Sequence, residues 1–151
     1  MAPRIRRPRI QPPSAGSRRL RLLLDTHFVL WAATERTQFT PDEYAMLIDP
    51  EHQLLVSGVS IWELRIKWNR RFRSGERKGP YEPKALLAAV QRLGLTVEPI
   101  TGEQCADFLD PPLMHGDPFD ELLLTVAQHL GARLFTRDDE LRGHPLAFHA
   151  N

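Results

Sequence analysis

Short apolar runs alternate with segments of helical periodicity along the chain from Leu20 onward. Apolar runs of four to eight residues are typical of strands that are covered on both faces, as in parallel sheets. The runs that we expect to form strands are 20–25, 53–57, 96–100, 133–136 and 146–148. This alternation predicts an α/β fold, in the form of a three-layer α/β/α sandwich around a central, mostly parallel sheet.

Helical periodicity and capping residues place helices between these runs. Thr40 before Pro41 is a good N-cap, and Gly94 and Gly131 follow helices that they can end in the left-handed conformation. The helices that we expect are 27–33, 41–48, a helix capped by Ser60, 83–93, 102–109 and 117–130. The basic stretch between the third and fourth of these helices contains two glycines and a proline, and is predicted to be an exposed loop.

The composition divides the chain into an arm and one domain. Residues 1–19 are rich in proline and arginine and lack hydrophobic periodicity, so we predict a disordered arm, followed by a single domain over 20–151. No apolar run approaches the roughly 18 residues that span a bilayer, so a membrane role is unsupported. The single cysteine, Cys105, excludes an internal disulfide and fits a cytoplasmic protein.

A formal net charge of +1 conceals two basic clusters. Segments 1–21 and 65–78 carry 14 of the 20 lysines and arginines, and only Glu76 opposes them. Clustered cations are expected where a protein contacts a phosphate backbone, although solvated tails and loops have the same composition. The candidate RNA-binding residues are Arg65, Lys67, Arg70, Arg71 and Arg73.

Four carboxylates stand where a parallel sheet delivers side chains to a cleft. Asp25 ends the first strand and Asp138 follows the fourth, whereas Glu63 and Asp120 fall in the first turns of helices. Sites in such sheets form at the carboxyl ends of the strands. Because clustered carboxylates repel one another, they usually bind hard cations such as Mg²⁺ or Mn²⁺, and a metal-activated water can attack a phosphodiester.

Each acid also has a structural interpretation. Glu63 could pair with Lys67 four residues on along a helix. Asp117 could cap a helix that begins at Pro118, with Asp120 favouring the helix dipole. Asp25 could simply start a turn, and Asp138 could cap a short helix, with its neighbour Asp139 an equal candidate for the fourth acid.

Three segments together resemble the PIN-domain family, especially the VapC-type toxins. The segments are LLLDTHFVLW at 22–31, SGVSIWELRIK at 57–67 and HGDPFDELLLTVAQHLGARLFTRDDEL at 115–141. In this resemblance the family's acids correspond to Asp25, Glu63, Asp120 and Asp138, with Asp117 as a secondary acid. Thr26 and Thr136 could orient carboxylates or waters, or could equally satisfy backbone groups.

The resemblance implies a metal-dependent endoribonuclease with Mg²⁺ or Mn²⁺ in a carboxylate pocket. It also implies a homodimer and a cognate antitoxin that inserts a segment near the pocket. The alternative is a catalytically silent PIN-like module that only binds RNA or a protein. His27 and His115 flank the expected site, but we assign them no catalytic role, and we expect Trp31 to serve in packing.

Overall fold

The computed structural model describes residues 19–70, 74–76 and 81–150. The predicted arm over 1–19 lies outside the described residues except for Arg19, so its disorder stays a prediction. Arg71 and Arg73, two of the candidate RNA-binding residues, also lie outside the described residues.

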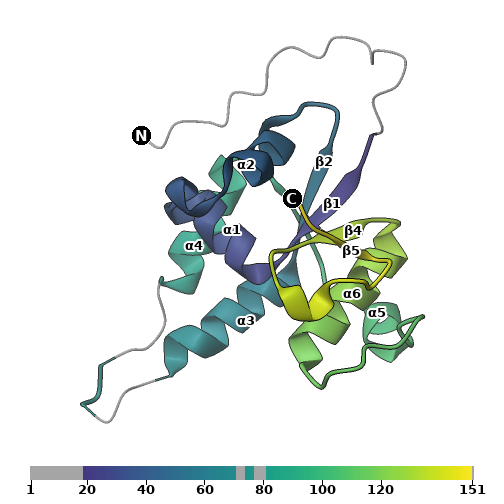
Figure 1. The fold of residues 1–151 in the computed structure, drawn as a ribbon. Coiled ribbons are helices and arrows are strands. Elements are labelled where there is room, and N and C mark those ends of the chain that lie inside the picture. The colour runs from purple at the N-terminus through teal and green to yellow at the C-terminus, as the bar shows by residue number, and fades with distance from the viewer. Residues whose placement is uncertain (1–18, 71–73, 77–80, 151) are drawn as a thin grey trace.

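The described strands form one sheet in the order β3-β2-β1-β4-β5, and all neighbouring pairs are parallel (Figure 1). They are β1 (Arg21–Leu24), β2 (Gln53–Ser57), β3 (Thr96–Glu98), β4 (Arg133–Phe135) and β5 (Ala147–Phe148). The chain adds β2 and β3 on one side of β1, then returns to add β4 and β5 on the other. The order therefore reverses between β1 and β4, and such a switch point opens a crevice at the carboxyl ends of the strands.

Helices cover both faces of this sheet, which confirms the predicted three-layer sandwich (Figure 1). Helices α1 to α4 lie on one side, and α5 and α6 lie on the other. Their bounds are α1 (Thr26–Thr34), α2 (Pro41–Ile48), α3 (Gly58–Asn69), α4 (Pro83–Arg92), α5 (Gly102–Ala106) and α6 (Pro118–Leu130), with short 3₁₀ turns η1 (Arg36–Gln38) and η2 (Asp139–Leu141). None of the described helices has the length and apolar character needed to cross a membrane.

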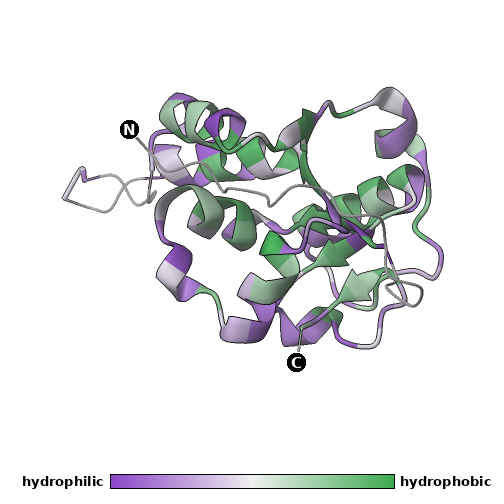
Figure 2. Ribbon diagram, turned by 90° about the horizontal axis from the view of Figure 1, so that it is seen from above, coloured by the Kyte–Doolittle hydropathy of each residue, from purple (hydrophilic) through white to green (hydrophobic). Residues whose placement is uncertain are grey.

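The central strand β1 supplies apolar side chains to both layers of the core. Leu22 and Leu24 join the cluster that contains Phe28 of α1, whereas Leu23 joins the cluster that contains Leu124 of α6. Successive side chains of a strand point to opposite faces, so a strand between two helical layers needs apolar residues at every position. In Figure 2 the strands are accordingly mostly green, the hydrophobic end of the scale.

The predicted capping residue of α3 was wrong. Ser57, the last residue of β2, caps the helix through a hydrogen bond of 3.0 Å from the Val59 N–H to its Oγ. Ser60 is instead buried inside the helix. Because β2 continues into α3 without a loop, Glu63 lies in the second turn of the helix and not in the first, as we had expected.

Other predicted boundaries need smaller corrections. The strand expected over 96–100 ends at Glu98, and the helix expected over 102–109 ends at Ala106. The N-caps predicted for α2 and α6 are confirmed. Thr40 forms a capping box with Glu43 at the start of α2, and Asp117 caps α6.

Gly131 ends α6 in the left-handed region, with a φ of 59°. A Cβ added there would meet only Nη1 of Arg21, at 3.8 Å, so the cost of a side chain comes from the backbone and not from a clash. We expect Gly131→Ala to lower the free energy of unfolding by about 1 kcal/mol, measured by urea denaturation. Gly102→Ala, at the start of α5 where φ is not positive and the space is open, should cause no such loss. Equal stabilities of the two variants would contradict this expectation.

Candidate active site

Asp25 lies between the ends of β1 and β4, at the switch point of the sheet. Its N–H donates to the carbonyl of Phe135 in β4 over 3.0 Å. Its Oδ1 accepts from the Phe28 N–H at 2.8 Å as the N-cap of α1, and its Oδ2 accepts from Oγ1 of Thr136 at 2.6 Å. Burial raises the pKa of Asp25 above its ordinary value, and the two hydrogen bonds offset part of that increase. Because each carboxylate oxygen of Asp25 accepts one of these hydrogen bonds, the orientation of the carboxylate is fixed.

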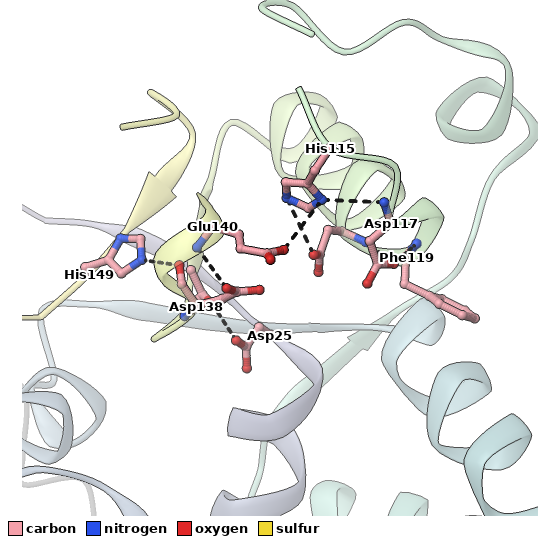
Figure 3. A network of polar contacts seen from close by, with 9 residues as sticks. Asp25, His115, Asp117, Phe119, Asp138, Glu140 and His149 are labelled. Carbon is pink, nitrogen blue, oxygen red and sulfur yellow. Dashed lines mark hydrogen bonds and ion pairs between the residues drawn. The ribbon is translucent and has the colours of Figure 1, made fainter. Parts of the chain in front are cut away.

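Thr136 connects two of the acids. The same buried hydroxyl that donates to Asp25 accepts from the Asp138 N–H at 3.0 Å. Asp138 in turn caps η2, with its Oδ1 accepting from the Glu140 N–H at 2.9 Å (Figure 3). Asp139, the other candidate for the fourth acid, pairs with the exposed Arg142 at 2.9 Å and does not line the pocket described below.

Glu63 is held between a hydroxyl and a cation. Thr26 Oγ1 donates to its Oε2 and also lies 3.2 Å from Oγ of Ser60. Lys67 Nζ lies 3.0 Å from its Oε1, so the ion pair expected along the helix is present. Glu63 nevertheless lines the same pocket as Asp25, and the structural and functional interpretations of this residue are therefore compatible.

The N-terminus of α6 contributes the remaining acids. Asp117 Oδ1 accepts from the Phe119 N–H at 2.9 Å and from the Asp120 N–H at 3.4 Å. Burial, followed by the charges of Asp117 and Asp138, raises the pKa of Asp120 to about 7. His115 lies across from Asp138 in Figure 3, with its Nε2 4.0 Å from Oδ2 of Asp120. Because the charges of Asp117 and Asp138 act on Asp120, these three carboxylates are close enough to repel one another.

These side chains surround one pocket of about 340 Å³ at the carboxyl edge of the sheet. All five predicted acids line it, together with Thr26 and Lys67, whereas Thr136 lies behind Asp25 and Asp138. The lining residues are Asp25, Thr26, His27, Phe28, Trp31, Glu63, Lys67, Asp117, Asp120, Leu123, Arg137 and Asp138. Of the other described candidates for RNA binding, Arg65 lines a separate groove between α3 and α4, and Arg70 is the exposed C-cap of α3.

The donor chemistry of the pocket fits a hard divalent cation. Its acidic groups offer only carboxylate oxygens, the ligands that Mg²⁺ and Mn²⁺ prefer. In the described part of the chain, no three acidic, histidine or cysteine side chains come close enough together to hold one ion in this arrangement. Glu63 is engaged by Thr26 and Lys67, so coordination of an ion by these residues requires their side chains to move inward.

Arg137 lines the pocket and was missed in the sequence analysis. Its Nε donates to Oε1 of Glu43 at 2.8 Å, its Nη2 contacts the other carboxylate oxygen, and the same Nη2 donates to the Gln38 carbonyl at 2.7 Å. Its Cζ lies 4.7 Å from the ring centroid of Trp31. Burial raises the pKa of Glu43, but hydrogen bonds from Arg137 and Thr40 outweigh it, and the net shift is downward. Only the position of Arg137 between Thr136 and Asp138 could have pointed to it in the sequence.

Comparison with known families agrees with this geometry. The model of the family described as PIN domain matches residues 22–145, a span that contains all five acids of the pocket. The chain belongs to the PIN-domain family. The resemblance seen in the three sequence segments is thereby confirmed.

Solved structures with a similar fold include toxin–antitoxin proteins. One is a chain in the crystal structure of VapBC2 from Rickettsia felis bound to a DNA fragment from their promoter, with a TM-score of 0.59 and 15% identity over 86% of this chain and 97% of that one. Another is a chain of a toxin–antitoxin complex from Klebsiella pneumoniae, with a TM-score of 0.55 and 15% identity over 86% and 98%. At this identity the likeness shows that the PIN domain shares their fold. No curated protein matches the sequence.

Proposed function

We propose that this PIN domain is a metal-dependent endoribonuclease that acts in the cytoplasm as the toxin of a type II toxin–antitoxin pair. The observation that carries the proposal is the meeting of Asp25, Glu63, Asp120 and Asp138 around one pocket at the switch point of the sheet. The fold shared with proteins of toxin–antitoxin complexes supports the toxin assignment.

Asp25, Glu63, Asp120 and Asp138 would hold one or two ions of Mg²⁺ or Mn²⁺, with Asp117 as a secondary ligand. When bound, the metal would lower the pKa of a water nucleophile and neutralise charge on the leaving oxygen. The chain's own residues prepare this site. Thr136 orients Asp25 and the backbone of Asp138, and Thr26 orients Glu63. Mutual repulsion among the acids favours binding of a cation between them.

Basic residues beyond Glu63 would grip the RNA backbone. Lys67 lies on the pocket wall, where it can reach a phosphate next to the scissile bond. Arg65 and Arg70 lie on and at the end of the same helix. Together with Arg71 and Arg73, they would set affinity and salt dependence but not base choice.

Two partners complete the proposal. A cognate antitoxin would restrain the nuclease, as the toxin–antitoxin complexes with the same fold suggest. A homodimer follows from the resemblance to the VapC-type toxins alone. Co-expression with the product of a small neighbouring gene should relieve growth arrest caused by this chain, and size-exclusion chromatography of the purified protein reports its oligomeric state. Growth arrest that no neighbouring gene relieves would contradict the toxin assignment.

The nuclease assignment is tested by incubating purified protein with total cellular RNA in Mn²⁺ or Mg²⁺, and in parallel with EDTA. We expect discrete fragments that disappear with the chelator, and mapping their ends identifies the target. If the protein binds Mn²⁺, as measured by calorimetry, yet leaves RNA intact, it is the catalytically silent binding module instead.

The hydroxyl of Thr136 is expected to be needed for cleavage even though it lies behind the pocket. Thr136→Val removes the donor to Asp25 and the acceptor for the Asp138 N–H while keeping the side-chain volume similar. Loss of such supporting hydrogen bonds typically lowers metal affinity or activity by about 10–100-fold, and we expect a decrease in cleavage rate in that range. Thr136→Ser keeps the hydroxyl and should retain most of the activity. Equal rates for the two variants would show that the hydroxyl has no such role.

A further inference from the structure

We propose that His27, Trp31 and Arg137 form a nucleotide subsite on the wall of the acid pocket, where an unpaired RNA base stacks and its neighbouring phosphate binds the guanidinium. The inference rests on the proposed endoribonuclease function and deepens it, because it says which part of the pocket recognises the substrate. None of the three residues is among the acids or the basic stretch that the sequence analysis assigned to the site.

Three flat side chains follow one another along this wall. The rings of His27 and Trp31 have centroids 5.7 Å apart and planes inclined by 34°. The guanidinium of Arg137 lies over the same indole, with its Cζ 4.7 Å from the ring centroid. All three residues line the pocket together with Asp25. The two rings come from the first two turns of α1, immediately after Asp25, so a base bound there would lie beside the reacting phosphate.

The subsite is held in place before any ligand arrives. Glu43, only 3% exposed, and the Gln38 carbonyl together engage Nε and Nη2 of Arg137. None of the hydrogen bonds within the described residues uses its Nη1. The Arg137 side chain is 43% exposed, and His27 is also exposed, whereas Trp31 is half-buried against the core. A rigid planar cation with a remaining donor edge binds phosphate with little loss of conformational entropy.

The ligand that suits this wall carries both a flat base and a negative charge. Unpaired RNA bases commonly stack on aromatic rings and on arginine planes, and RNA is recognised mostly where its bases are unstacked. The rest of the pocket carries five carboxylates, which repel a phosphate. Arg137 and Lys67 are the cationic residues among those that line it, so a phosphate that enters needs one of them. A nucleotide can use both features at once, because its base can stack on the His27 ring while its phosphate binds Arg137.

Fluorescence anisotropy can separate the two contacts in the full chain carrying Asp25→Asn, which is expected to bind RNA without cutting it. The probes are a labelled single-stranded RNA of mixed sequence, about ten nucleotides long and so within the usual span of such grooves, and an abasic ribose-phosphate strand of the same length. We expect His27→Ala to weaken binding of the RNA by about 10-fold and to leave binding of the abasic strand unchanged. We expect Arg137→Gln to weaken binding of both probes by about 10-fold.

Matched variants distinguish a binding role from a structural one. Arg142→Gln and His129→Ala make similar changes at exposed residues outside the pocket. Both should bind each probe as tightly as the Asp25→Asn chain without further changes does. Glu43→Gln weakens the tether of Arg137 but keeps the guanidinium, so it should weaken binding less than Arg137→Gln does. If melting curves show that Arg137→Gln does not fold, Arg137→Lys takes its place, because it keeps the charge and loses the planar group.

Two results would overturn the subsite. One is loss of affinity in Glu43→Gln as large as in Arg137→Gln, which would show that the arginine acts only through packing. The other is an effect of His27→Ala that is absent, or is equal for RNA and abasic strand. The cleavage assay is independent of this test. If the unsubstituted chain cuts no RNA while the Asp25→Asn chain shows the expected binding differences, the proposed nuclease is refuted and the subsite stands. If the unsubstituted chain cuts RNA while the binding differences are absent, the nuclease stands and the subsite is refuted.

Discussion

Asp25→Asn is expected to lower the rate of RNA cleavage by at least about 100-fold, the upper end of what is lost when residues that only support a metal site are changed. The substitution keeps the shape of the side chain and its capping acceptor for the Phe28 N–H. It removes one negative charge from the proposed ligand set at the centre of the switch point. The measurement is the initial rate of cleavage of a mapped RNA substrate in saturating Mn²⁺.

The same variant should not be less stable than the parent in the presence of EDTA. Burial raises the pKa of Asp25 in the folded state, so the folded protein binds a proton more readily than the unfolded chain does at this residue. The ionised carboxylate therefore costs stability above the unfolded pKa, and that cost disappears as the pH falls. A neutral amide lacks this cost at pH 7. Asp139→Asn, an exposed residue outside the pocket, is the matched control and should change neither cleavage nor melting temperature. A large fall in the melting temperature of Asp25→Asn would mean that its loss of activity reports unfolding.

Phe28→Ala is expected to reduce the free energy of unfolding by about 3–5 kcal/mol, a large share of the roughly 5–15 kcal/mol that stabilises most domains. Phe28 is fully buried at the start of α1. Its ring packs edge-on against Phe135 and Phe39, with centroids 4.8 and 5.2 Å away, so alanine would leave a cavity between α1 and β4. Urea denaturation followed by tryptophan fluorescence measures the loss.

Phe108→Ala is the control for this change. Phe108 is 88% exposed, and its truncation should alter stability by less than about 0.5 kcal/mol. Similar losses in the two variants would contradict the assignment of Phe28 to the core. Because Phe28 also lines the acid pocket, the surviving folded fraction of Phe28→Ala should cleave more slowly per folded molecule.

The fold was predictable because its signals are local. Strand β1 is apolar at Leu22, Leu23 and Leu24, the pattern that a strand with helices on both faces needs. The start of α3 was not predictable, because both Ser57 and Ser60 are good capping residues. The choice between them depends on β2 running directly into the helix, which is a property of the sheet and not of the neighbouring residues.

That the predicted acids would meet around one pocket was predictable for a related reason. Asp25 and Asp138 stand at the ends of strands, where topology alone directs side chains toward a cleft. Arg137 was not predictable, since its partner Glu43 is 94 residues away and is itself engaged in the capping box of α2 with Thr40. Trp31 was expected only to pack. It does so against Phe28 and Phe39, but it also lines the pocket, and no periodicity in the sequence distinguishes these two roles.

The pairing of β1 with β4 has a consequence for synthesis of the protein. Asp25 and Thr136 touch although 111 residues separate them, so the two halves of the acid pocket leave the ribosome far apart in time. A nascent chain that has folded β1 to β3 holds Asp25 and Glu63 but lacks the opposite wall, and one edge of β1 stays open until β4 arrives. If the chain is the proposed nuclease, the nascent protein could cut RNA only after η2 has emerged and docked. The copy under synthesis would therefore lack the complete pocket while most of its chain is being translated.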